Sequence, residues 1–192
     1  MAENNTEPAL ILDGENSAQQ SFSFAALSER SDQVANFFRR LEIRPDDRML
    51  VMLQNEVTLW ETVLAACKLG LVIIPTSTMI GGDDLDDRLE RGHVQHVIAT
   101  SSCKQKFGPD STVSSRILVG AAAKGWIEYK ESYAESKQFA PEVPVRASDP
   151  LLLYFTSGTT SKPKMVLHSQ YSYPIGHLST MYWIGIKPGD VH

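Results

Sequence analysis

The residues best suited to chemistry lie in one short segment, Thr156–Lys164. It follows an apolar run, Leu151–Phe155, and ends with two lysines that flank a proline. Its hydroxyl side chains are Thr156, Ser157, Thr159, Thr160 and Ser161. Gly158 lets the backbone approach a ligand closely, and consecutive backbone N–H groups in such a turn can form an anion-binding nest. Hydrogen-bond donors with the cations Lys162 and Lys164, and no acid among them, suit a polyphosphate.

The Walker A loop, the obvious competing phosphate-binding pattern, does not fit this segment. That loop reads GxxxxGK followed by serine or threonine, and it opens a helix. Here Gly158 is the only glycine, no Gly-Lys pair occurs, and a second apolar stretch, Met165–His168, indicates a strand after the loop. The remaining alternative is a plain surface turn rich in serine and threonine, which the flanking strands and the length of the pattern disfavour.

Other residues whose side chains could take part in catalysis are better explained by structural roles. His168 lies near a strand end and His177 in a helix expected over Ser169–Trp183, so neither is predicted to be catalytic. Cys67 is expected in the core, on a helix face that it shares with Trp60 and Leu64.

Acidic and aromatic clusters are interpreted in the same way. The aspartates at the start of an expected helix, which suit a solvated terminus favoured by the helix dipole better than a metal site, are Asp83, Asp84, Asp86 and Asp87. The aromatic residues expected to pack rather than to stack on a substrate are Tyr171, Tyr173, Tyr182 and Trp183. We predict no metal site made of protein ligands.

The elements that must position the loop alternate between strands and helices. The expected strands are Glu7–Asp13, Met49–Leu53, Leu71–Ile74, His96–Ala99, Ile117–Val119 and Leu151–Phe155. The expected helices are Ser23–Leu41, with Ser23 as its cap, Val57–Leu69, ended by Gly70, and Asp83–Glu90. Such alternation predicts an α/β fold with a mainly parallel sheet and flanking helices. Residues 1–8 are expected to be disordered, and 131–150 are expected to form a surface connection.

Composition excludes several classes of protein. The 192 residues carry a net charge of −5 with scattered basic residues, which gives no basic surface for nucleic acid. No apolar stretch approaches the roughly 20 residues that span a bilayer, and the first residues lack the pattern of a signal peptide. The two cysteines, Cys67 and Cys103, stand far apart, which favours a reducing, cytoplasmic compartment.

The segment Tyr154–Lys164 resembles the signature loop of the adenylate-forming superfamily, which includes acyl-CoA synthetases and amino-acid adenylation domains. Two positions depart from the common pattern: Ser161 and Met165 stand where glycines are usual. Pro163-Lys164-Met165 followed by His168-Ser169 is similar to medium-chain acyl-CoA synthetases. Further similarity to the superfamily lies in Phe22–Leu27, Val34–Phe38, Ala65–Gly70 and Lys187–Asp190, so that it covers the chain from about Ala9 onward.

The resemblance implies part of the large N-terminal domain of an AMP-forming acid–CoA ligase. In that family, ATP and a carboxylic acid give an acyl-adenylate and pyrophosphate, and coenzyme A then displaces AMP, with Mg²⁺ on the phosphates. The positions that match the family's phosphate contacts are Thr156, Ser157, Gly158, Thr159, Thr160 and Lys164, of which Lys164 is also the candidate catalytic residue.

The family's acyl pocket, hinge and C-terminal catalytic lysine have no counterpart before His192. We therefore expect the 192 residues alone to be unable to complete adenylation. Two alternatives stay open: a nucleotide-binding or interaction module without catalysis, and a fragment of an amino-acid adenylation domain. The sequence does not identify the acid or the oligomeric state.

Overall fold

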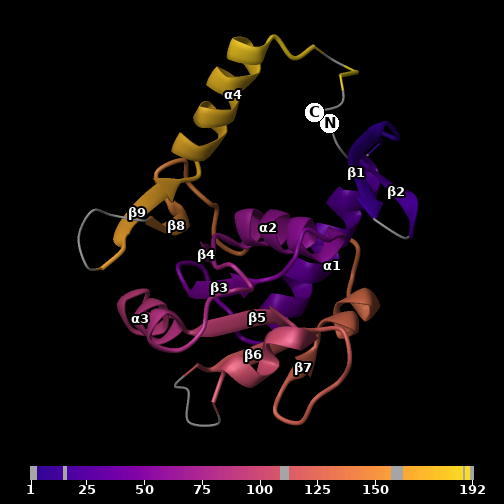
Figure 1. Ribbon diagram of the computed structural model, residues 1–192. Coiled ribbons are helices and arrows are strands. Elements are labelled where there is room, and N and C mark those ends of the chain that lie inside the picture. Colours follow the sequence, from indigo (N-terminus) through magenta and orange to yellow (C-terminus); the bar gives the residue numbers. More distant parts are fainter. Residues whose placement is uncertain (1–3, 15–16, 109–112, 157–161, 188, 191–192) are drawn as a thin grey trace.

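The computed structural model describes residues 4–14, 17–108, 113–156, 162–187 and 189–190. Its centre is a seven-stranded sheet with the strand order β7-β6-β5-β3-β4-β8-β9 (Figure 1). The strands are β3 (Arg48–Met52), β4 (Val72–Pro75), β5 (His96–Thr100), β6 (Ser115–Val119), β7 (Ile127–Glu128), β8 (Pro150–Thr156) and β9 (Lys164–Ser169). All neighbouring strands are parallel except β8 and β9, which form an antiparallel hairpin at one edge. The predicted α/β fold with a mainly parallel sheet is confirmed.

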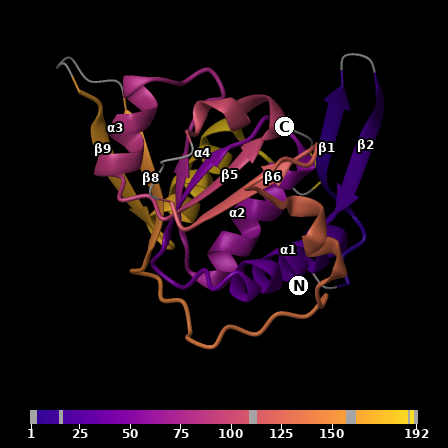
Figure 2. The same ribbon diagram turned by 90° about the horizontal axis from the view of Figure 1, so that it is seen from below.

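Helices cover both faces of this sheet. The α-helices are α1 (Phe24–Arg40), α2 (Val57–Leu69), α3 (Asp83–Arg91) and α4 (Ser172–Ile184), and two short 3₁₀ helices are η1 (Ser101–Lys106) and η2 (Tyr129–Ala134). Figure 2 shows α1 and α2 on the side of the sheet opposite to α3. Two separate hydrophobic clusters result, one beneath α1 and α2 and one beneath α3 and η1. No helix in the described ranges has the length and apolarity that a bilayer crossing requires.

Successive side chains of the central strands point to opposite faces of the sheet, which explains the two clusters. In β8, Leu152 belongs to the cluster beneath α1 and α2, whereas Leu153 belongs to the cluster beneath α3. Tyr154 and Phe155 continue this alternation, because successive side chains of a strand point to opposite faces. The approach to the loop is therefore anchored on both faces of the sheet.

The ends of α1 and α2 follow the predicted signals. Ser23 caps α1, with its hydroxyl oxygen accepting a hydrogen bond from the N–H of Ala26 at 3.1 Å. Gly70 ends α2 with a φ of 81°, a left-handed conformation that glycine adopts without strain, and its N–H donates to the carbonyl of Ala66.

The predicted buried face of α2 is wrong. Trp60 and Leu64 are exposed, and Cys67 is half-buried at the margin of the core. The face that packs inward carries Glu61, Thr62, Ala65, Ala66 and Leu69. Both sets have helical spacing, so the period alone could not choose between them, and the small alanines allow closer approach to the neighbouring elements.

The first residues form a hairpin that the sequence predicted only in part. Strand β1 (Pro8–Gly14) was expected, but its antiparallel partner β2 (Ser17–Ser23) was not, because it is polar. Residues 1–3 lie outside the described part of the chain, whereas the carbonyl of Asn5 accepts a hydrogen bond from the N–H of Ala25 at the start of α1. Of the expected surface connection 131–150, the first residues belong to η2.

Helix α4 follows β9 and extends away from the sheet (Figure 1). None of its residues is buried, and Trp183 is 91% exposed. The expectation that the aromatic residues here pack inward is met by Tyr173 alone, which lies against the core, while Tyr171, Tyr182 and Trp183 are exposed within the described structure.

Candidate phosphate-binding hairpin

The loop predicted to bind phosphate joins the ends of β8 and β9. Strand β8 is parallel to β4, which is parallel to β3, so the loop leaves the edge of the sheet at which these parallel strands end. This carboxyl-terminal edge is where open α/β sheets bind ligands. The sequence-predicted residues Ser157, Gly158, Thr159, Thr160 and Ser161 lie outside the described residues, so the described structure gives the two arms of the loop.

The arms are held in register by their first and last residues. Thr156 is directly opposite Lys164 in the β8–β9 ladder, and the hydroxyl of Thr156 donates to the carbonyl of Lys164 at 3.3 Å. Both predicted residues are exposed at the same end of the hairpin. The side chain of Lys164 makes no hydrogen bond or ion pair with any other described residue, which leaves its ammonium group available to a ligand.

The second arm contacts helix α3. Lys162 Nζ lies 3.3 Å from Asp87 Oδ1, and Arg91 donates to Asp87 Oδ2 at 2.8 Å. Arg91 also donates to the carbonyl oxygen of Pro163 at 2.9 Å. Although desolvation opposes ionisation of Asp87, the hydrogen bonds from Arg91 and Lys162 lower its pKa below the ordinary value. Asp87 is thus an anion shared between Lys162 of the hairpin and Arg91 of α3.

The aspartates of α3 are therefore of two kinds. Asp83, Asp84 and Asp86 are exposed in the first turn, as predicted for a solvated helix start. Asp87 was grouped with them but has the role of an ion-pair partner for the loop. The spacing of Asp87 and Arg91, four residues apart on a helix, predicts their mutual pair, whereas nothing in the sequence links them to Lys162.

The histidine after the loop has a packing role. The ring of His168 lies 5.7 Å from that of Tyr154 and 6.3 Å from that of Tyr173, which in turn is 4.5 Å from His177. Burial, and then the hydrogen bond with Tyr173, raise the pKa of Tyr154 to about 12. This row of rings ties β8, β9 and the start of α4 together, and it agrees with the structural interpretation of both histidines.

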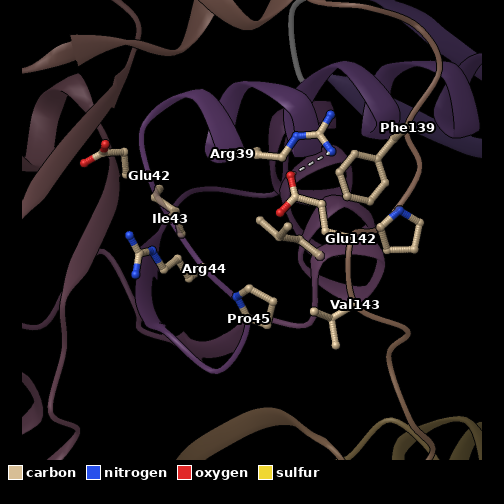
Figure 3. A pocket seen from close by; sticks show the side chains of 10 residues that line it. Arg39, Glu42, Ile43, Arg44, Pro45, Phe139, Glu142 and Val143 are labelled. Atoms are coloured by element: carbon tan, nitrogen blue, oxygen red, sulfur yellow. Dashed lines mark ion pairs between the residues drawn. The ribbon is translucent and has the colours of Figure 1, made fainter.

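A cavity of about 260 Å³ lies elsewhere, between the end of α1 and the segment 139–143 (Figure 3). Ile43 and Pro45 line it just before β3 begins, so it lies at the amino-terminal edge of the parallel strands. Of its two arginines, Arg39 is 3.8 Å from the carboxylate of Glu142 and lies over the ring of Phe139, whereas the Arg44 side chain has no hydrogen bond or ion pair with a described residue. The cavity lies at the edge of the sheet opposite to the loop and is therefore separate from the predicted phosphate site.

Comparison with known proteins identifies the family of the chain. The model of a family described as AMP-binding enzyme matches residues 1–191. The chain belongs to this family. Among curated relatives, human acyl-coenzyme A synthetase ACSM5, mitochondrial, is 30% identical over 181 residues, which cover 91% of this chain and 31% of that protein.

Solved structures show the same fold for this AMP-binding enzyme chain. An acyl-CoA synthetase from Brucella canis superposes with a TM-score of 0.85 at 20% identity, over 97% of this chain and 35% of that one. Acetoacetyl-CoA synthetase from Streptomyces lividans gives a TM-score of 0.85 at 23% identity, over 96% and 31%. The chain thus spans about a third of the length of the relatives it matches. The predicted similarity to the adenylate-forming acyl-CoA synthetases is confirmed.

Among the described residues of this family member, no group of three or more histidine, cysteine, aspartate or glutamate side chains could hold a metal ion. Asp87, the acid that contacts the loop, is already paired with Arg91 and Lys162. Lys164 and the hydroxyl of Thr156, at the base of the loop, fit an anionic ligand.

Proposed function

We propose that this chain supplies the phosphate-binding loop of an AMP-forming acid–CoA ligase. The loop binds the β- and γ-phosphates of ATP while a carboxylic acid is activated to an acyl-adenylate. Coenzyme A then converts the acyl-adenylate to the acyl-CoA. The observation that carries the proposal is the hairpin geometry: Thr156 and Lys164 face each other across the base of the loop, at the ligand-binding edge of the sheet.

The charges around the hairpin support a polyphosphate over other anions. Lys162 and Lys164 both lie on the hairpin; Lys162 pairs with Asp87 of α3, whereas the side chain of Lys164 makes no ion pair with a described residue. A polyphosphate, which carries negative charge on several groups, is the anion that we propose for these two lysines and the hydroxyl donors of the loop. Exposed lysine ammonium groups interact with such a ligand as point charges.

The proposed chemistry needs stabilisation of a leaving group. A carboxylate oxygen attacks the α-phosphorus, the bond from that phosphorus to the bridging oxygen breaks, and the electron pair leaves with pyrophosphate. Negative charge therefore grows on the β- and γ-phosphates, where Lys164 and the donors Thr156, Ser157, Gly158, Thr159 and Thr160 are proposed to act. Preorganised donors stabilise developing charge better than water, which must reorient. Mg²⁺, held by phosphate oxygens, supplies further charge neutralisation.

The proposed substrate is a fatty or aryl carboxylic acid. The Pro163-Lys164-Met165 sequence with His168-Ser169 is similar to medium-chain acyl-CoA synthetases, and the printed names of the relatives include acyl-CoA and acetoacetyl-CoA synthetases. The proposed compartment is the cytoplasm, in line with the free thiols of Cys67 and Cys103.

Isothermal titration of the chain with MgATP and with magnesium tripolyphosphate tests the proposal. Both ligands are expected to bind, because the loop recognises the phosphates, whereas AMP, which lacks the β- and γ-phosphates, is expected to bind at least tenfold more weakly. Lys164→Met should weaken both triphosphates. The matched control is Lys124→Met, which removes an exposed lysine between β6 and β7 that makes no ion pair with any described residue. Equal affinity for AMP and ATP, or no effect of Lys164→Met, would contradict the phosphate role.

A further inference from the structure

The contact between α3 and the second arm of the loop has a geometry that a chance surface ion pair lacks. Arg91 uses two different nitrogens, one on Asp87 at 2.8 Å and one on the backbone carbonyl of Pro163 at 2.9 Å. The second oxygen of Asp87 lies 3.3 Å from Lys162. One carboxylate and one guanidinium thus hold a side chain and a main-chain atom of adjacent residues.

The first arm is held by the same helix. The guanidinium carbons of Arg88 and Arg91 lie 5.3 and 5.6 Å from the centre of the Phe155 ring, within cation–π range. Phe155 packs against the hydrophobic cluster beneath α3. Arg91 therefore contacts Phe155 before the loop and Pro163 after it, which fixes the two arms relative to one another.

The exposed fractions of the side chains show which contacts of this network are strong and which are weak. The Lys162 side chain is 72% exposed, whereas that of Asp87 is 15% exposed. An ion pair to so exposed a lysine contributes little by itself. The bond from Arg91 to the Pro163 carbonyl restrains the backbone directly, and Asp87 holds Arg91 in the orientation that makes this bond possible.

We propose that Asp87 and Arg91 are positioning residues for the phosphate-binding hairpin, which they hold from α3 so that Lys162 and Lys164 are presented to a nucleoside triphosphate. The role rests on the proposed function of the loop. Asp87 acts through Arg91 and Lys162 and does not touch the nucleotide.

The direction in which MgATP affinity changes when Asp87 loses its charge distinguishes a positioning role from a purely electrostatic effect. Removing a negative charge beside a polyanion site should strengthen binding if Asp87 acts only through its charge. If Asp87 positions the loop, Asp87→Asn should instead weaken MgATP binding, by about fivefold, the scale of one largely exposed ion pair. Arg91→Lys keeps the charge but loses the fork that reaches both Asp87 and Pro163, so it should weaken binding as well.

The experiment measures MgATP binding to the whole chain by isothermal titration at constant ionic strength, for four proteins. These are the unmodified chain, Asp87→Asn, Arg91→Lys and the control Asp86→Asn, which removes the same charge from an exposed side chain of the same helix that makes no contact with the loop. Backbone amide exchange of β9 is measured in parallel without nucleotide, and circular dichroism checks the fold of each variant.

The positioning role predicts weaker binding and faster exchange in β9 for Asp87→Asn and Arg91→Lys, with Asp86→Asn within about twofold of the unmodified chain. Binding of Asp87→Asn that equals or exceeds that of the unmodified chain overturns the positioning role and leaves the proposed function in place. Absence of MgATP binding to the unmodified chain overturns both, and the exchange data then show separately whether α3 restrains the hairpin.

Discussion

Replacement of Arg30 by methionine is expected to destabilise the folded chain by about 3 kcal/mol, because it leaves a buried carboxylate without its cation. Glu61 on α2 is only 3% exposed, and both of its oxygens accept hydrogen bonds from Arg30, at 3.2 and 3.3 Å. The hydroxyl of Tyr129 donates to one of them at 2.8 Å. Methionine preserves much of the arginine stem, so the change removes charge and donors more than packing.

The size of the expected loss in stability follows from the interactions that Glu61 keeps in the variant. Breaking a buried ion pair from one side costs roughly 3–5 kcal/mol, and the bond from Tyr129 keeps the loss near the lower end. Loss of the contact between Arg30 and the ring of Tyr133, at 3.8 Å, adds roughly 0.5–1 kcal/mol. The side chain of Arg30 is partly exposed, and water that reaches Glu61 in the variant offsets a similar amount.

Urea unfolding followed by circular dichroism measures the change. The matched control is Arg44→Met, since the exposed side chain of Arg44 makes no hydrogen bond or ion pair with a described residue, and its expected effect is within about 0.5 kcal/mol. The double variant Arg30→Met/Glu61→Leu should be far less destabilised than the sum of its single changes, because it leaves no uncompensated charge. A loss below about 1 kcal/mol for Arg30→Met, or additive single effects, would refute the reasoning.

Two further predictions concern the ends of helices and high pH. Ser23→Ala should cost about 1 kcal/mol, because the N–H of Ala26 loses its cap, whereas Ser21→Ala in the preceding strand should have little effect; urea midpoints that match for the two variants would contradict the capping role. Burial and Glu61 raise the pKa of Tyr129 well above its ordinary value, and burial and Tyr173 raise that of Tyr154 to about 12. Because both values exceed the unfolded value of about 10, the stability they contribute is present below that pH and is lost as the pH rises toward 12. Urea unfolding between pH 8 and 11.5, with tyrosinate absorbance at 295 nm, checks this, and an unchanged alkaline loss in a Tyr129→Phe/Tyr154→Phe variant would contradict it.

Local signals in the sequence predicted most of the fold. The apolar run Met49–Leu53 is buried, as are the first three residues of Leu151–Phe155, and continuous apolar runs of that length are typical of parallel strands. Ser23 and Gly70 each act through atoms within a few residues, so their effects on helix ends could be predicted. Strand β2 could not, because its polar residues gain order from pairing with β1 rather than from burial.

The candidate site, too, contains residues that the sequence predicted and residues that it could not predict. Thr156 and Lys164 could be predicted because the phosphate-binding pattern is contiguous in sequence. The network of Asp87, Arg91 and Lys162 could not, since it joins residues 75 positions apart whose proximity depends on how α3 packs beside β8. The wrong face of α2 has a related cause: helical periodicity gives a spacing, and tertiary packing selects which of two compatible faces is buried.

Labelling with an acyl-phosphate derivative of ATP tests the central claim most directly, because this reagent transfers its acyl group to lysines beside the bound phosphates. If the β8–β9 hairpin binds the polyphosphate, mass spectrometry should find the label on Lys164 and Lys162. Excess MgATP or magnesium pyrophosphate should suppress that labelling, and AMP should not. Labelling of exposed lysines such as Lys124 to the same extent, without protection by MgATP, would contradict the assignment of this hairpin as the phosphate-binding site.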